Sequence, residues 1–204
     1  NDPLYLNAAA TQTPTTGQWY LQTPTSTLVS AINAEAAWAI TTGKPSVVVA
    51  DLDTGVRFDH PDLASKLLPG YDFIHDSGNA SDGGARDTDP SDPGDYVTSA
   101  DVGVVAGCTS DMVDTHATSS WHGTQTAGLI AAATNTGIGM AGAGRDVKLL
   151  PVRVLGCGGG WDSDIQAAML WAAGVSAVPV ANPNPAKVLN LSLGASVACT
   201  TAYA

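Results

Sequence analysis

Residues 47–56 read V-V-V-A-D-L-D-T-G-V, and this stretch decides the fold. Its apolar residues, Val47 to Ala50 and Leu52, predict a strand that is buried on both faces. Asp53 follows where that strand should stop. Burying a carboxylate is costly unless it is paired or hydrogen-bonded, and ligands bind at the carboxyl ends of strands in open α/β sheets. Asp53 is therefore either a candidate for chemistry or an Asp that caps the turn after a strand.

The composition is that of a folded domain with an acidic balance. Of the 204 residues, 44% are hydrophobic and 13% are charged, so the chain can bury a sizeable core and one domain is expected. The net charge of −11, from 19 acidic and 8 basic residues, argues against a nucleic-acid partner. Because no apolar run approaches the eighteen or so residues of a membrane span, we expect no membrane partner either.

Helical and strand patterns alternate along the chain. This alternation predicts a three-layer α/β fold, with a mostly parallel sheet and helices on both faces. Residues 1–27 lack periodicity and are expected to form an extended arm, whereas residues 28–204 form the α/β core. The Gly- and Asp-rich segment 75–120 is expected to be mostly loop. Besides the strand above, we predict a short strand at 70–74 and buried strands at 147–155 and 188–193. Helices are predicted at 28–40, 122–133 and 163–173, the last with Ser163 as its N-cap, and a turn with a short helix at 58–68.

The segment after the long loop, residues 121–128, reads W-H-G-T-Q-T-A-G. A histidine at a helix start can place its ring at the end of a neighbouring strand, and the small residues Gly123 and Ala127 allow close packing there. A carboxylate that holds the ring N–H fixes the tautomer that a general base requires. His122 is thus a candidate partner of Asp53, although a lone histidine at a helix start more commonly bonds a backbone group.

These two motifs together resemble the subtilisin-like serine proteases, the subtilase family. The acidic loop is most similar to that of secreted bacterial members. The resemblance implies a subtilisin-like fold and a secreted, extracellular serine endopeptidase that works through an acyl-enzyme, with Asp, His and Ser in that order along the chain. It also implies protein or peptide substrates and a cleaved N-terminal propeptide. Further matching segments are H-P-D-L at 60–63, V-R-V-L-G at 152–156 and L-N-L-S-L-G at 189–194.

The resemblance also implies roles for individual residues. Asp53 would orient His122, which would act as general base and general acid. The catalytic serine and the oxyanion donor are expected beyond residue 204, so residues 1–204 would be the N-terminal part of one catalytic domain whose sheet is incomplete at its C-terminal end. The substrate cleft is expected between two walls, formed by Gly158, Gly159 and Gly160 on one side and by Ser192, Leu193 and Gly194 on the other.

Calcium is the cofactor that the resemblance implies. A tight Ca²⁺ site is expected from the side chains of Asp2, Asp62 and Asn135. Backbone oxygens of the loop 133–140, including those of Ala133 and Gly137, would complete it. A second site in the acidic loop would use Asp87, Asp89, Asp92 and Asp95; the alternative for this loop is a solvated acidic turn.

Three cysteines allow one disulfide with a thiol left over, or one cysteine whose partner lies outside the chain. In the family's geometry, Cys108 and Cys157 both lie near one rim of the cleft. We therefore expect these two to pair, and Cys199 to bond a cysteine beyond residue 204.

Two residues depart from the family pattern. Asp51 stands where members carry an apolar residue, and Gln125 stands where they carry a histidine. We expect a hydrogen bond between the two, with the Asp51 carboxyl protonated at neutral pH.

Two other functions compete with the endopeptidase. A non-catalytic pseudoprotease or binding scaffold of the same fold is compatible with the absence of a nucleophile motif from this chain. An aspartic protease also uses D-T-G, but it needs a second such Asp, and the sequence contains no second D-T-G or D-S-G.

Overall fold

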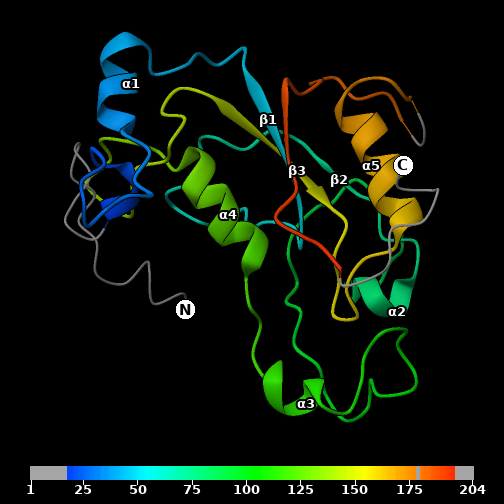
Figure 1. Cartoon of the computed structure of the whole chain (residues 1–204). Coiled ribbons are helices and arrows are strands. Elements are labelled where there is room, and N and C mark those ends of the chain that lie inside the picture. The colour runs from blue at the N-terminus through cyan, green and yellow to red at the C-terminus, as the bar shows by residue number, and fades with distance from the viewer. Residues whose placement is uncertain (1–17, 178–179, 196–204) are drawn as a thin grey trace.

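A parallel sheet lies at the centre of the molecule (Figure 1). The computed structural model describes residues 18–177 and 180–195, so Asp2, Cys199 and most of the predicted arm lie outside the described residues. Four strands pair in the order β2-β3-β1-β4, and each neighbouring pair is parallel. The strands are β1 (Val48–Asp53), β2 (Tyr71–Asp72), β3 (Lys148–Arg153) and β4 (Val188–Asn190).

Helices cover both faces of this sheet, as Figure 1 shows for α4 and α5. The described helical segments are η1 (Trp19–Leu21), α1 (Ala34–Ile40), α2 (Ser77–Ala80), α3 (Met112–Thr115), α4 (His122–Ala131) and α5 (Asp162–Ala172). None of them is long and apolar enough to cross a membrane. The predicted three-layer α/β fold is confirmed.

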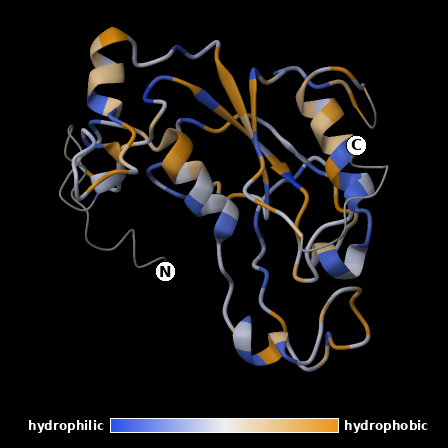
Figure 2. Ribbon diagram, in the orientation of Figure 1, coloured by the Kyte–Doolittle hydropathy of each residue, from blue (hydrophilic) through white to orange (hydrophobic). Residues whose placement is uncertain are grey.

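Strand β1 is central because all six of its residues are buried and it pairs on both edges. Its side chains alternate between the two layers, as the period of a strand requires. Val48, Ala50 and Leu52 pack with Trp171 of α5, and Val49 packs with Ala127 and Ala131 of α4. Figure 2 shows the resulting apolar strands at the centre of the fold. Asp51 and Asp53 therefore belong to the face that α4 covers.

The predicted helix at 28–40 is wrong in its first half, since α1 begins only at Ala34. The N–H groups before α1 bond to another segment. Ile32 N–H donates to the Tyr20 carbonyl at 2.7 Å, and Asn33 N–H donates to the Gln22 carbonyl at 2.9 Å. Asn33 also has the left-handed backbone conformation. The end of the predicted arm is likewise not an extended surface segment. Leu21 is fully buried in a small cluster with Ala34 and Ala141.

Three further predictions need correction. Residues 58–68 contain the predicted turn but not the short helix, and the His60 carbonyl accepts from Leu63 N–H and Ala64 N–H. Pro61 in this segment has no N–H to donate. The N-cap of α5 is Trp161, not Ser163. Strand β4 is not buried, because among the described strands it pairs with β1 alone, and Val188 is 51% exposed.

Candidate active site

Asp53 and His122 meet at the carboxyl end of β1. The ring Nδ1 of His122 lies 2.7 Å from Oδ1 and 2.9 Å from Oδ2 of Asp53. The Asp53 side chain is 1% exposed, whereas the His122 side chain is 45% exposed. A hydrogen on Nδ1 satisfies the carboxylate and leaves Nε2 as the acceptor, which is the tautomer that a general base needs. The pair is thus a buried acceptor that orients a solvent-accessible base.

Close packing of α4 on the end of β1 makes this contact. A Cβ on Gly123 would lie 2.2 Å from the Gly55 carbonyl oxygen and 3.1 Å from Asp53 Cβ, so only glycine fits there. Thr54 secures the same junction: its hydroxyl accepts from Gly123 N–H at 3.0 Å and donates to Asp92 at 2.7 Å. The D-T-G and H-G-T motifs are therefore joined twice, by the contact of His122 with Asp53 and by the bond from Gly123 N–H to Thr54.

The neighbouring carboxyl, Asp51, is 4% exposed and does not bond Gln125 as predicted. Its Oδ2 accepts from the Thr126 hydroxyl at 2.7 Å, and its Oδ1 accepts from the Asn190 amide at 2.8 Å. Gln125 instead donates to the Ser120 carbonyl at 2.7 Å. The reason is the helical phase, because the position that follows Gly123 by three residues faces the sheet, and that residue is Thr126. Burial raises the pKa of Asp51 to about 7, which supports the predicted uptake of a proton near neutral pH.

The glycines of the first predicted cleft wall have mainly internal reasons to be glycine. A Cβ on Gly158 would lie 2.0 Å from the Ala106 carbonyl oxygen, and a Cβ on Gly160 would lie 2.6 Å from Leu155. Gly159 has open space beside it but adopts φ +88°, which side chains disfavour. The Asn79 side chain holds this turn by accepting from Gly158 N–H at 2.6 Å and donating to the Gly159 carbonyl at 2.9 Å. Sequence reasoning missed Asn79, since no spacing marks it within the long loop.

The second predicted wall follows β4. Ser192 and Gly194 are exposed and Leu193 is half-buried. The Ser192 hydroxyl accepts from the Asn190 amide at 3.0 Å. This segment therefore continues the edge strand next to β1, on the side of the sheet opposite to β3.

Asp62 and the loop 133–140 do come together. Asp62 is 1% exposed, and its Oδ2 accepts from Met140 N–H at 2.8 Å. A Cβ on Gly139 would lie 1.9 Å from Asp62 Oδ2, so the loop closes directly on the carboxylate. Burial raises the pKa of Asp62, and no ion pair to it occurs among the described residues. The carboxylate accepts from Met140 N–H and from the Thr136 hydroxyl, so a calcium ion here would need backbone oxygens of the loop as its further ligands. Asn135 lies in this loop in the left-handed conformation, with its side chain exposed.

The acidic loop does not gather its four carboxylates. Asp87 and Asp89 accept from the backbone N–H groups of Asp89 and Ser91, and Asp95 accepts from the N–H and hydroxyl of Ser120. Asp92 is directed at Thr54. Within the described part of the chain, no group of three or more acidic, histidine or cysteine residues could hold a metal ion. Asp92 and Asp95 thus tie the loop to Thr54 and Ser120, whereas the carboxylates of Asp87 and Asp89 bond to backbone within the loop.

Cys108 and Cys157 lie side by side, with their Sγ atoms 3.1 Å apart and both residues buried. No S–S bond joins them in this structure. Burial and the neighbouring Cys157 raise the pKa of the Cys108 thiol to about 12, so the reduced pair holds little thiolate at neutral pH.

Arg153 is a further residue that sequence reasoning missed. It ends β3, next to Asp53 in the strand register, and is 1% exposed. Its guanidinium donates to Asp72 at 2.6 Å, to Asp82 at 2.8 Å and to the Thr54 carbonyl at 3.1 Å. It therefore fixes the loop that follows Asp53 through the Thr54 carbonyl, and it pairs with the buried carboxylate of Asp72. A charged residue inside the buried run V-R-V was the available signal.

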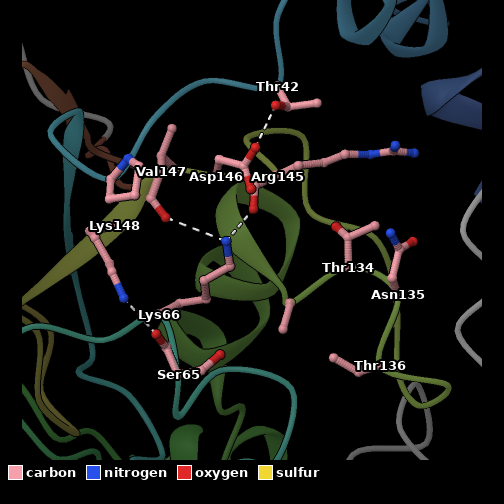
Figure 3. A pocket seen from close by; sticks show the side chains of 12 residues that line it. Thr42, Ser65, Lys66, Thr134, Asn135, Thr136, Arg145, Asp146, Val147 and Lys148 are labelled. Atoms are coloured by element: carbon pink, nitrogen blue, oxygen red, sulfur yellow. Dashed lines mark hydrogen bonds between the residues drawn. The ribbon is translucent and has the colours of Figure 1, made fainter.

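A cavity of about 430 Å³ is lined by neither Asp53 nor His122, but its lining includes Ala133 and Asn135 of the predicted calcium loop (Figure 3). Its basic side chains do not converge on an open point. Lys66 donates to the carbonyls of Arg145 and Val147, and Lys148 donates to the Ser65 carbonyl at 2.7 Å. The lysine charges are thus already engaged by the backbone, and the cavity has no role in the chemistry of Asp53 and His122.

The arrangement defines a class of protein: a three-layer α/β fold in which a buried Asp at a strand end orients an exposed His at a helix start. Residues 44–203 match the family model described as the subtilase family. The chain therefore belongs to the subtilase family. This membership also excludes the aspartic protease interpretation of D-T-G.

Several known proteins are similar to this chain. An "Extracellular protease" of Xanthomonas campestris pv. campestris is 44% identical over 94% of this chain and 32% of its own length. An "Extracellular basic protease" of Dichelobacter nodosus is 44% identical over 83% of this chain and 27% of its own length. A solved protease structure from Pseudoalteromonas arctica superposes with a TM-score of 0.72 at 46% identity, covering 85% of this chain and 48% of that one. The chain thus spans about a third of the length of these curated relatives.

Replacement of Asp51 by Asn should stabilise the fold at high pH. The pKa of Asp51 is about 7 in the fold, against about 3.9 in an unfolded chain, so the folded wild type loses stability as pH rises from about 4 to about 7. Asn cannot ionise, and its advantage should grow over this window to at most roughly 4 kcal/mol. Urea unfolding at pH 4.5 and pH 8 measures it.

Two details make this comparison clean. A His122→Ala background in every arm prevents self-digestion, and Asp114→Asn, on an exposed position of α3, is the matched change of charge. An Asp51→Asn advantage of equal size at both pH values, or no advantage, would show that Asp51 is ionised in the fold at low cost.

Proposed function

We propose that this chain is part of a secreted serine endopeptidase, with Asp53 and His122 as two members of an Asp-His-Ser triad whose serine lies beyond residue 204. The observation that carries the proposal is the bond from the His122 ring to the buried Asp53, which leaves Nε2 on the exposed side. Among the described residues, no serine hydroxyl bonds to that ring. The similar proteases supply the second support, since the match covers only 32%, 27% and 48% of their own lengths.

In this proposal, His122 Nε2 removes the proton of the serine hydroxyl as the serine attacks the peptide carbonyl. Asp53 stabilises the imidazolium that forms and does not itself take the proton. His122 then protonates the leaving amine, and water repeats the cycle to release the acyl group. Because Asp53 is buried and already bonded to Thr54 N–H at 2.7 Å, its carboxylate does not have to reorganise during the reaction.

The proposed substrates are proteins or peptides bound as an extended strand. The segment Ser192–Gly194 would pair with the substrate backbone, because it continues β4, which pairs with β1 alone among the described strands. Gly158–Gly160 would form the facing wall. Extracellular action and an N-terminal propeptide removed on maturation complete the proposal, and the names of the two bacterial relatives support the first of these.

Replacing His122 by Ala should reduce turnover of a peptide substrate by about 10⁶, the order of the loss when the corresponding group of subtilisin is removed. The active protein that carries this chain is assayed for hydrolysis and for labelling by an active-site serine reagent. His116→Ala, at the end of α3, is the control and should keep both.

If the folded His122→Ala variant still hydrolyses peptide at the wild-type rate, the proposed triad is wrong. If the wild type folds but neither hydrolyses peptide nor becomes labelled, the non-catalytic scaffold takes its place.

We also propose a calcium site at Asp62 with the loop 133–140, completed by Asp2 and Asn135. Excess chelator should lower the melting temperature, because a ligand at a thousand times its dissociation constant stabilises the fold by about 4 kcal/mol. Asp62→Asn should abolish this calcium-dependent stabilisation. Asp89→Asn, in the acidic loop, tests the second predicted site and should leave most of it intact.

The reverse pattern, with Asp89→Asn abolishing the effect and Asp62→Asn retaining it, would move the site to the acidic loop. Melting that is unchanged by chelator in the wild type would contradict both sites.

A third proposal is that Cys108 and Cys157 form a disulfide in the secreted protein, and that Cys199 pairs with a cysteine outside this chain. The two sulfurs are already neighbours, and a bridge between them would close a loop of about fifty residues, stabilising the fold by roughly 4 kcal/mol in the chain-entropy model. Peptide mapping without reduction should recover residues 108 and 157 in one linked species. Alkylation of both thiols before any reductant is added would disprove the pairing.

A further inference from the structure

A chain of polar contacts joins the Asp53–His122 pair to the predicted substrate segment. It runs from Asp53 through Thr126, Asp51 and Asn190 to Ser192. The successive distances are 3.4 Å, 2.7 Å, 2.8 Å and 3.0 Å. The chain crosses three elements, since it begins on β1, touches α4, returns to β1 and ends on β4 and the residues after it.

The hydrogens available satisfy both oxygens of Asp51, but Thr126 cannot donate to Asp51 and to Asp53 at the same time. Asn190 has two amide hydrogens, of which one reaches Asp51 Oδ1 and the other reaches Ser192 Oγ. The single hydroxyl hydrogen of Thr126 has its nearest acceptor in Asp51 Oδ2. Reversing the Asn190 amide would turn its oxygen against the ionised Asp51 carboxylate and lose that bond, whereas the Ser192 hydroxyl could donate to either end of the amide. The direction of the amide is therefore set by Asp51.

Strand β4 needs such a contact because its own pairing is short. It has three residues, it pairs with β1, and Val188 at its start is half exposed. Asp51 and Asn190 are direct partners in the strand register, so their side chains project on the same face of the sheet. The bond between them adds a side-chain link to a three-residue ladder.

We propose that Asp51 is a positioning residue that ties β4, and with it Ser192–Gly194, to the Asp53–His122 pair, so that this carboxyl sets the affinity for peptide. The inference rests on the proposed function only for the part that concerns peptide. An aliphatic side chain would fill the same buried space at a lower cost, but it would leave Thr126 and Asn190 without their shared acceptor. Asp51 thus makes the fold less stable than an aliphatic residue would, but it fixes the position of β4.

The test compares Asp51→Val with Asp51→Asn in the active protein. Asp51→Val removes both bonds. Asp51→Asn keeps them, because its amide oxygen accepts from Asn190 and its amide nitrogen donates to Thr126. Asp114→Asn is again the matched control on the surface. Hydrogen exchange of the β4 amides and the separate values of KM and kcat are measured for each.

Asp51→Val should speed exchange of the β4 amides and raise KM, each by about tenfold, the equivalent of one hydrogen bond to a charged group. Its kcat should change much less, and its melting temperature should stay equal or rise because a buried carboxyl is gone. Asp51→Asn should restore both values to within about twofold of the wild type, well inside the effect of one neutral hydrogen bond. If Asp51→Val does not fold, Asn190→Ala on the half-exposed edge strand tests the same contact with the same expected exchange.

Unchanged exchange of the β4 amides in Asp51→Val would overturn the proposal. It would also be overturned if these amides exchanged as fast in Asp51→Asn as in Asp51→Val. A uniform increase in exchange with a lower melting temperature would also overturn it, since that marks a general structural role. The exchange readout needs no activity. Loss of hydrolysis in the wild type, with the expected exchange pattern, would therefore contradict the proposed protease and leave the β4 contact standing.

Discussion

The structure depends on the need to satisfy two carboxylates on one face of a buried strand. Asp51 and Asp53 are 4% and 1% exposed, and both lie on the face of β1 that α4 covers. An unpaired charge at this depth would cost several kcal/mol. Each carboxyl therefore needs hydrogen-bond donors, and α4 and β4 must supply residues that donate to it. Asp53 takes His122 and the Thr54 amide, while Asp51 takes Thr126 and Asn190.

This requirement propagates outward through close packing. His122 reaches Asp53 only if α4 approaches the end of β1, and that approach demands glycine at position 123. The turn after β1 must then be held, which Thr54, Asp92 and Arg153 accomplish from three different segments. The acidic loop accordingly serves the catalytic junction through Asp92, whatever else it binds. Function and stability are coupled here because the same hydrogen bonds serve both.

Much of this arrangement was predictable from the sequence. A buried apolar run that ends in an Asp predicts β1 and its end. A histidine before small residues predicts a helix, α4, that can approach this end. The contact between Asp53 and His122 was therefore predictable from these two local patterns. The partner of Asp51 was not, because the choice between Gln125 and Thr126 depends on the phase of α4 against the sheet. The start of α1 was missed because its preceding amides bond to residues 20 and 22, a contact that periodicity does not reveal. Asn79 and Arg153 act through tertiary contacts with segments more than seventy residues away.

The most direct test of this account is to observe the proton between His122 Nδ1 and Asp53. Proton NMR of the folded protein labelled with nitrogen-15 should show a downfield, exchange-protected Nδ1–H resonance that correlates with the His122 ring. The account predicts that Asp53→Asn abolishes this resonance and that Asp51→Asn retains it, because Asp51 contacts Thr126 and Asn190 and not the ring. A resonance that survives Asp53→Asn, or that is absent from the folded wild type, would contradict the claim that Asp53 orients His122.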